Sequence, residues 1–322
     1  MNIATIGTSG ITTLFISAAK KQGLHFTAAY SRETHRAEMF ASQHEMPLFF
    51  TDLVQMAKSD AFEAVYIASP NVFHYEQSKL FLEHGKHVLC EKPLTSTLEQ
   101  QKKLTALADE KGLIYTEAIM SIHTPAFSAL KRALPKIGKI RTANLIFCQL
   151  SSKYPAYLRR ENPNIFNPAM HTGCLMDIGV YNLYLAAALF GKPDGIQSDA
   201  VFLESGADAA GTATLRYGDM LCNLVYSKVG QSFSPSEIIG DEGTISIGSV
   251  SQLTDVALIT KTEKIQLAAA NLSRDEVMGA EAGYFENAVR NGGTEAYAFA
   301  RQTAETVREL TDIIRKDNHF PF

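Results

Sequence analysis

A lysine directly after an apolar strand is the first candidate for chemistry in this sequence. Residues 87–93 read His-Val-Leu-Cys-Glu-Lys-Pro, so a carboxylate, an amine and a proline follow the strand in succession. Open parallel sheets bind their ligands outside the carboxyl ends of their strands, which places Lys92 at the mouth of a candidate site. Pro93 forces a turn there and restricts the backbone of Lys92. This segment alone leaves open the alternative of a lysine and a glutamate on an ordinary loop.

A second candidate is the turn after the first predicted strand, which reads Gly-Thr-Ser-Gly-Ile-Thr over residues 7–12. The dinucleotide fingerprint uses small residues for a tight turn, for close approach of the backbone to pyrophosphate and for helix packing. The literal Gly-x-Gly-x-x-Gly pattern is absent, but small residues at its three positions still permit the geometry. Free amides at the start of the following helix would receive the pyrophosphate. We expect dinucleotide phosphates here, with a purely structural turn as the alternative; the binding residues would be Gly7, Ser9, Gly10 and Ile11.

The end of the second predicted strand indicates which dinucleotide is bound. NAD enzymes usually carry an acid there for the ribose hydroxyls, whereas this chain has Ser31 and Arg32. A hydroxyl and a permanently charged guanidinium suit a 2′-phosphate, so NADP is favoured and NAD remains possible. Glu33 is the counter-argument, because a shift of one residue would bring a carboxylate to the ribose. A solvated charged turn is the other open alternative.

A third group of chemically useful residues lies in the second half of the chain. Asp177 and Tyr181 are four residues apart on a predicted helix over residues 174–190 and share one face of it. The apolar face is formed by Met176, Val180, Leu183 and Ala187. Two polar groups therefore point in the same direction. A carboxylate favoured by the helix dipole and an interfacial aromatic ring are the structural alternative.

The elements around these residues predict an α/β fold with two domains. Residues 1–120 alternate short apolar strands with amphipathic helices, which is typical of a doubly wound parallel Rossmann sheet; its strands are expected at 3–6, 26–30, 64–68 and 88–90. The spacing of residues 96–99 predicts a capping box that starts a helix through Glu110.

Residues 121–322 predict an α+β domain on a largely antiparallel sheet. Its helices are expected at 174–190, 279–291 and 295–316, and its strands at 140–150, 196–204, 211–217, 220–228, 244–248 and 255–260. So few helices leave one face of the sheet uncovered, and such a face is usually buried against another subunit. We therefore expect a homodimer or a higher homo-oligomer.

Composition excludes several classes of function. The chain of 322 residues is 46% hydrophobic, which is enough for a sizeable core, and its net charge of −4 with dispersed basic residues argues against nucleic acid. No cationic leader or apolar run of about 20 residues is evident, so a cytoplasmic protein without a membrane partner is expected. The four cysteines form no Cys-x-x-Cys pair, so they are expected to be reduced and structural, without a metal.

Taken together, the motifs resemble the Gfo/Idh/MocA oxidoreductases over nearly the whole chain. The matching segments are Gly7-Thr-Ser, Ser31-Arg32, Ser69-Pro-Asn71-x-x-His74, Gly85-Lys-His-Val-x-x-Glu91-Lys92-Pro93, Glu117-Ala-x-Met120, Asp177-Ile-Gly-Val-Tyr181 and Ile239-Gly-x-x-Gly243-Thr244. The resemblance implies an N-terminal Rossmann domain that binds NAD(P) and a C-terminal domain whose sheet often forms a dimer interface. It also implies a sugar, polyol or trans-dihydrodiol substrate and a cis Lys92–Pro93 bond.

The resemblance also implies roles for single residues. Lys92 is the catalytic lysine, Tyr181 moves the hydroxyl proton, and Asp177 orients the pair. The resemblance adds Ser69, Asn71, His74 and Glu91 to the cofactor-binding residues, with Asn71 and Glu91 expected beside the nicotinamide ribose. Lys92 is expected to be both catalytic and cofactor-binding. A tyrosine with a pKa near ~10 is a poor base at neutral pH, but a nearby ammonium lowers that pKa, and Lys92 is expected to supply it. Tyrosine at this position resembles the dihydrodiol dehydrogenase and glucose-fructose oxidoreductase branch.

Departures from the family pattern fall on the expected substrate side. Ile122 stands where many members have arginine, and residues 171–173 read His-Thr-Gly in place of a run of glycines. His123, Asn167 and His171 are candidates for contacts with polyol hydroxyls, with ordinary structural roles as the open alternative. Two other functions remain: a non-catalytic NADP-binding sensor or regulator of this fold, and a glycosidase using NAD for transient oxidation. The presence of Lys92 and Tyr181 argues against the first, and the missing ribose acid against the second.

Overall fold

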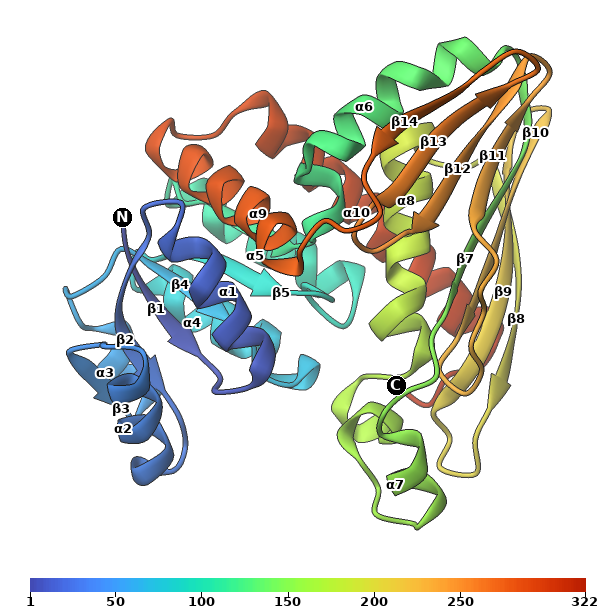
Figure 1. The fold of residues 1–322 in the computed structure, drawn as a ribbon. Helices are drawn as coiled ribbons and strands as arrows, with labels where there is room; N and C mark the ends of the chain where they lie inside the picture. The colour runs from blue at the N-terminus through green and yellow to red at the C-terminus, as the bar shows by residue number, and fades with distance from the viewer. The chain divides into compact units, whose positions relative to one another are not determined.

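A computed structural model describes all residues, 1–322, and groups them into two compact units (Figure 1). The first unit contains Met1–Ile119 and Ser273–Gln302, and the second contains Met120–Leu272 and Thr303–Phe322. The division near residue 120 agrees with the sequence analysis, but residues 273–302 were expected in the second domain. An amphipathic helix shows in its sequence that one face is packed, and it does not show which domain it packs on.

The first unit is built on a parallel sheet of six strands in the order β3-β2-β1-β4-β5-β6, which confirms the predicted Rossmann architecture. The strands are β1 (Asn2–Ile6), β2 (His25–Tyr30), β3 (Leu48–Phe50), β4 (Ala64–Ile67), β5 (His87–Glu91) and β6 (Tyr115–Ala118). The central strands are buried on both faces, as β4 illustrates with four buried residues. This burial explains why they read as continuous apolar runs in the sequence.

Helices connect and cover these strands. They are α1 (Gly10–Lys20), α2 (Thr34–Gln43), α3 (Leu53–Ala57), α4 (His74–Glu83) and α5 (Leu98–Glu110), joined by α9 (Arg274–Arg290) and the first part of α10 (Glu295–Asp317). Helix α9 packs along α1, and Lys21 forms an ion pair with Asp275 beside them. A segment far away in the sequence thus completes the first unit.

The second unit contains a sheet of eight strands in the order β14-β13-β12-β11-β7-β10-β9-β8. The strands are β7 (Ile140–Cys148), β8 (Gly195–Phe202), β9 (Asp208–Tyr217), β10 (Met220–Ser227), β11 (Ser236–Gly240), β12 (Gly243–Ser249), β13 (Thr254–Thr260) and β14 (Lys264–Ala268). All neighbouring pairs are antiparallel except β7 with β10, which is parallel. The predicted largely antiparallel sheet is confirmed.

Helices of the second unit lie on one face of this sheet and leave the other face bare, as the sequence analysis expected (Figure 1). They are α6 (Pro125–Ala133), α7 (Tyr154–Leu158), α8 (Val180–Phe190) and the end of α10. The buried Tyr226 ring lies between Gly179 and Gly211, where an added Cβ would approach it to 3.0 Å and 2.5 Å respectively. Glycine at both positions therefore lets the helix lie close to the sheet.

One apolar stretch is longer than the sequence analysis expected. Pro168–Phe190 has the length and the hydropathy, 1.4, of a candidate membrane span. However, 83% of its most apolar window is buried inside the protein, which is the behaviour of a core helix.

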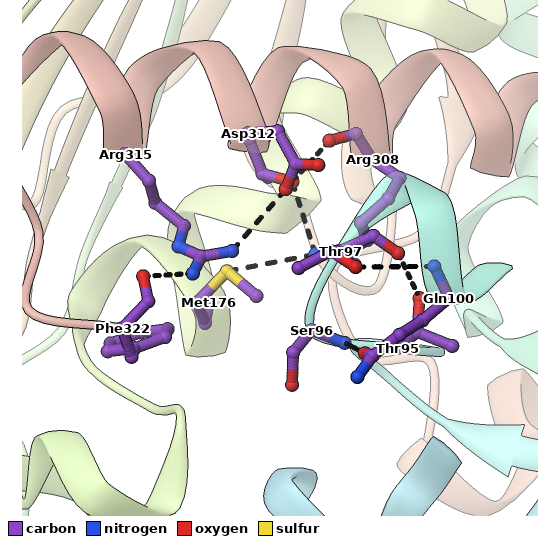
Figure 2. Close-up of polar contacts among 10 residues, drawn as sticks. Thr95, Ser96, Thr97, Gln100, Met176, Arg308, Asp312, Arg315 and Phe322 are labelled. Carbon is purple, nitrogen blue, oxygen red and sulfur yellow. Dashed lines mark hydrogen bonds and ion pairs between the residues drawn. The ribbon is translucent and has the colours of Figure 1, made fainter.

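Several local predictions need correction. The helix cap after Pro93 is Thr97, whose hydroxyl accepts from the Gln100 amide at 3.2 Å, while the Gln100 side chain accepts from the Ser96 amide (Figure 2). The N-cap is therefore one residue later than predicted, and the Gln100 side chain reaches the amide of the residue before the N-cap. The sequence analysis also missed the elements β3, β6, β11, β14, α3, α6 and α7, all of nine residues or fewer. Short elements carry too few residues to show a period.

Candidate functional site

The predicted cofactor residues of the first unit gather at the carboxyl edge of the parallel sheet. Gly7 follows β1, Ser31 follows β2, Ser69 follows β4, and Lys92 follows β5. The strand order reverses direction between β1 and β4, since β2 and β3 lie to one side and β5 and β6 to the other. Such a switch point is where open α/β sheets bind their ligands.

The turn after β1 has the close approach that a dinucleotide requires. Gly7 has φ +114°, and an added Cβ would lie 2.6 Å from the Ala68 carbonyl oxygen, so only glycine fits. A Cβ on Gly10 would meet nothing within 4 Å, which leaves open space beside the helix start. Ser9 is the N-cap of α1, but its side chain accepts no capping hydrogen bond, and the first turn carries no acidic residue. The amides there remain suited to an anion.

The end of β2 presents an unpaired cation. Arg32 is exposed and forms no ion pair within the chain, whereas the Ser31 amide is fixed by donating to the Phe50 carbonyl at 3.2 Å. Glu33 is exposed and occupies the N-cap of α2 without a side-chain capping bond. The guanidinium is therefore available for a phosphate at this strand end.

The backbone after Lys92 is clamped by two buried side chains. The Lys92–Pro93 peptide is cis, as the resemblance implied. The Pro93 carbonyl lies 2.8 Å from Nδ1 of His74, and the Leu94 amide donates to Oε1 of Glu117 at 2.9 Å. These contacts come from α4 and from the end of β6, so residues distant in sequence fix the direction in which the chain leaves Lys92.

His74 is fully buried, and its other ring nitrogen, Nε2, lies 2.8 Å from the Ser69 carbonyl. It therefore ties the loop after β4 to the loop after β5, and its burial indicates a positioning role instead of direct contact with the cofactor. The Ser69 hydroxyl donates to Oε1 of Gln77 at 2.6 Å. Asn71 is half-buried and begins a short 3-10 turn, Asn71–Phe73.

Glu91 accepts a 2.5 Å hydrogen bond from the Tyr66 hydroxyl. Burial raises the pKa of the Glu91 carboxyl, and the neighbouring Lys92 ammonium opposes that rise. Glu281 on α9 is also buried, and burial followed by the Glu91 charge raises its pKa well above the usual range. The sequence analysis missed Tyr66 and Glu281, because their neighbours lie 25 and 190 residues away and no local pattern marks them.

The second unit carries Asp177 and Tyr181 at the start of its central helix. A π-helical turn, Leu175–Gly179, precedes α8. The Asp208 carboxylate, from the start of β9, accepts from the Leu175 amide at 2.6 Å. Burial raises the pKa of Asp208 to about 7, and the Leu175 hydrogen bond opposes this rise. A Cβ on Gly173 would lie 1.8 Å from Oδ1 of Asp208, so the glycine makes room for this cap.

Asp177 forms an ion pair with Lys228, which follows β10. Tyr181 is 6% exposed, and its ring contacts Phe147 edge to face at 5.9 Å. The predicted apolar face is confirmed by the burial of Met176, Val180, Leu183 and Ala187. Lys228 was not foreseen, because a lone lysine 51 residues from its partner has no sequence signal.

The structure describes the surroundings of the three residues whose roles the sequence analysis left open. Burial lowers the pKa of His123 to about 3, so its ring is neutral near pH 7. Asn167 accepts from the Ala169 amide at 3.1 Å. The His171 ring stacks on Phe322 at 5.1 Å, and Arg315 contacts the same Phe322 (Figure 2). All four cysteines are free thiols, as expected, and no group of three or more His, Cys, Asp or Glu side chains is placed to hold a metal.

Comparison with protein families matches both halves of the chain. Residues 1–119 match the model described as an oxidoreductase family with an NAD-binding Rossmann fold. Residues 129–246 match the Gfo/Idh/MocA C-terminal domain.

Individual relatives agree with these matches. An NADP+-dependent scyllo-inositol 2-dehydrogenase of Bacillus subtilis is 43% identical over 78% of this chain and 76% of its own. A human trans-1,2-dihydrobenzene-1,2-diol dehydrogenase is 26% identical over 90% of this chain and 87% of its own. The fold is shared with a 3-ketoreductase from Actinomadura kijaniata solved with TDP-benzene and NADP, with a TM-score of 0.81, 22% identity and coverage of 98% and 96%.

Proposed function

The chain belongs to the Gfo/Idh/MocA family of NAD(P)-dependent oxidoreductases, and from this premise we propose that it is an NADP-dependent dehydrogenase of sugars, polyols or trans-dihydrodiols. The observation that carries the proposal is the clamped strand end at Lys92, because His74 and Glu117 fix the backbone directly after this lysine at the carboxyl edge of the sheet, one strand from the switch point. The relative that acts on scyllo-inositol supports a polyol as the substrate.

The chain's own residues fit NADP. The missing Cβ of Gly7 and the uncapped amides of α1 suit the pyrophosphate, and the exposed Arg32 suits the 2′-phosphate. Asn71 and Glu91 would lie beside the nicotinamide ribose. The cofactor supplies a hydride acceptor or donor at the nicotinamide ring.

Side chains of the protein transfer the proton of the substrate hydroxyl. Lys92 holds the substrate hydroxyl, Tyr181 takes or returns its proton, and Asp177 orients the tyrosine. A positively charged neighbour favours the phenolate, which makes tyrosine an adequate base near neutral pH. These roles rest on the motif positions of the three residues in the family pattern.

A homodimer in the cytoplasm, without nucleic-acid or membrane partners, completes the proposal. The bare face of the eight-stranded sheet supports self-association (Figure 1). The net charge of −4 supports the absence of a nucleic-acid partner.

A turnover screen tests the proposed activity. Purified protein is mixed with NADP+ or NAD+ and with inositols, aldoses or trans-dihydrodiols, and reduction is followed at the nicotinamide absorbance. We expect turnover with at least one polyol or dihydrodiol and a preference for NADP+. Tight NADP binding without turnover on any of these, in either direction, would identify a sensor or regulator instead.

A further inference from the structure

We propose that Lys228 is a positioning residue that holds the Asp177 carboxylate in place and neutralises its charge at the start of the helix that carries Tyr181. The inference deepens the proposed function and rests on it for the roles of Asp177 and Tyr181. Lys228 would act through Asp177, without touching the substrate.

The backbone of Lys228 is fixed from two sides. Its amide donates to the Ala209 carbonyl at 2.9 Å, and its carbonyl accepts from the Ser151 amide at 2.9 Å. Because side chains alternate along a strand, Lys228 continues the inward row of Leu224 and Tyr226, both of which are buried. The lysine therefore points toward the helix-covered side of the sheet.

The side chain of Lys228 is buried where it meets Asp177. Lys228 as a residue is 7% exposed, and the ion pair joins Nζ to Oδ2 of Asp177. Exposed ion pairs contribute little to stability, but here the Lys228 side chain is only 9% exposed and the Asp177 side chain 28%, so water compensates only part of the Asp177 charge when the lysine is removed. Lys228 therefore contributes to the orientation of the Asp177 carboxylate and to its charge balance.

The surroundings of this pair contain further titratable groups. Asp208 is buried below the same helix start and interacts unfavourably with the Asp177 charge. The titratable and charged groups that face this region from the helix start, the sheet and α10 are Cys148, Cys174, Tyr181, Asp208, Tyr226 and Arg315. The Lys228 ammonium supplies positive charge at Asp177 that opposes this unfavourable interaction.

Loss of the Lys228 charge should affect the ionisation of Tyr181, which lies four residues after Asp177. Without the Lys228 ammonium, the negative charge of Asp177, about one helical turn away, is less compensated and disfavours a phenolate by Coulomb repulsion. Removing Lys228 should therefore make Tyr181 harder to deprotonate and slow proton transfer, while the cofactor residues of the first unit are untouched.

The test combines NMR titration with kinetics. Protein labelled with 13Cζ-tyrosine is titrated as wild type, Lys228→Met, Lys228→Gln and Lys228→Arg, and the Tyr181 signal is assigned with Tyr181→Phe. Lys192→Met is the matched control, because it breaks an exposed ion pair with Glu309 in the same unit. In Lys228→Met we expect the Tyr181 midpoint to rise by on the order of one unit, and kcat below that midpoint to fall by on the order of tenfold. The KM for NADP+ should change less than about twofold, as a loss confined to proton transfer requires.

The remaining variants separate a positioning role from a merely structural one. Lys228→Arg should restore most of kcat, and Lys228→Gln provides the neutral variant if methionine prevents folding. In an Asp177→Asn background Lys228→Met should have little further effect on kcat, because the two residues act as one unit. An unchanged Tyr181 midpoint, or an equal loss in the Asp177→Asn background, would overturn the inference. A shifted midpoint in a protein that turns over no polyol would keep the Lys228 inference and overturn the proposed function.

Discussion

Single residues determine the geometry at the cofactor end of the first unit. Gly7 is required because a side chain would collide with the Ala68 carbonyl, and Lys92 is aimed by contacts to the two residues that follow it. Arg32 differs from these, since it is exposed and forms no ion pair in the chain. A residue without a structural role is the best place to test binding alone.

We expect Arg32→Ala to narrow the preference for NADP over NAD. A hydrogen bond to a charged group contributes roughly 1.5 to 3 kcal/mol, so NADP affinity should fall by about 10-fold to 100-fold while NAD affinity changes little. Arg36→Ala is the control, because Arg36 is also exposed one turn further along. Titration of both variants with both cofactors measures the effect, and equal affinities of the unmodified protein for NADP and NAD would contradict it.

At the scale of elements, the sequence predicted the long strands and helices well, because their periods repeat over many residues. The sequence does not decide which apolar residues of a helix are buried: in α1, Leu14 is 38% exposed while Ile16 is buried. Both side chains are apolar, so hydrophobicity alone allows either one to be buried. The element that packs against the helix determines which one is. Helix α9 illustrates the same limit, since its place in the first unit depends on contacts across the whole chain.

The helix start at Asp208 gives a pH prediction. Burial raises the pKa of the Asp208 carboxyl to about 7 from 3.8. Between these two pH values the folded state therefore holds a proton that the unfolded state has released. The stabilisation of the folded state by protonated Asp208 is therefore fully present below about pH 4, and it is lost as pH rises to about 7. Asp208→Asn keeps an acceptor for the Leu175 amide and removes the charge.

Relative to wild type, Asp208→Asn should become more stable as pH rises from about 4 to about 7, by on the order of 4 kcal/mol at most, and the difference should be constant above that range. Urea unfolding at a series of pH values measures it. Parallel stability curves for the two proteins across pH 4 to 8 would show that Asp208 does not titrate in this way.

The second unit presents a sheet face without helices at the scale of the whole molecule. This face mixes Thr214, Asn223 and Asn144, joined by 3.0 Å hydrogen bonds, with apolar side chains such as Val225 and Ile259. Subunit interfaces also combine polar and apolar side chains, so this composition is compatible with the proposed homodimer.

Introducing a charge there should disrupt the proposed homodimer. Val225 lies on β10 in the interior of the sheet and is 38% exposed, so Val225→Arg should convert a homodimer to monomers by burying an unpaired charge. Leu158→Arg is the control, because Leu158 is also exposed but lies on α7, outside the strands of the sheet. Sedimentation equilibrium measures the masses, and an unmodified protein that is monomeric at micromolar concentration would refute the dimer.

The candidate site was predictable to the extent that its residues follow strands or share a helix turn. Lys92, Asp177, Tyr181 and the turn at Gly7 were proposed in this way, and their roles stay predictions. Contacts that form only in the tertiary structure, such as the ion pair of Lys228 with Asp177, have no signal in the local spacing of the sequence.

The central claim is that Lys92 and Tyr181 carry the proton transfer, and steady-state kinetics of their variants test it most directly. On the polyol or dihydrodiol with the highest turnover, Tyr181→Phe should keep NADP affinity and lower kcat by on the order of 10² to 10⁴, the usual range for general acid–base catalysis. Lys92→Ala should be at least as damaging, and the double variant should lose much less than the product of the two, because residues that act as one unit are not additive. Near-normal kcat in Tyr181→Phe would contradict the account and remove the tyrosine from the mechanism.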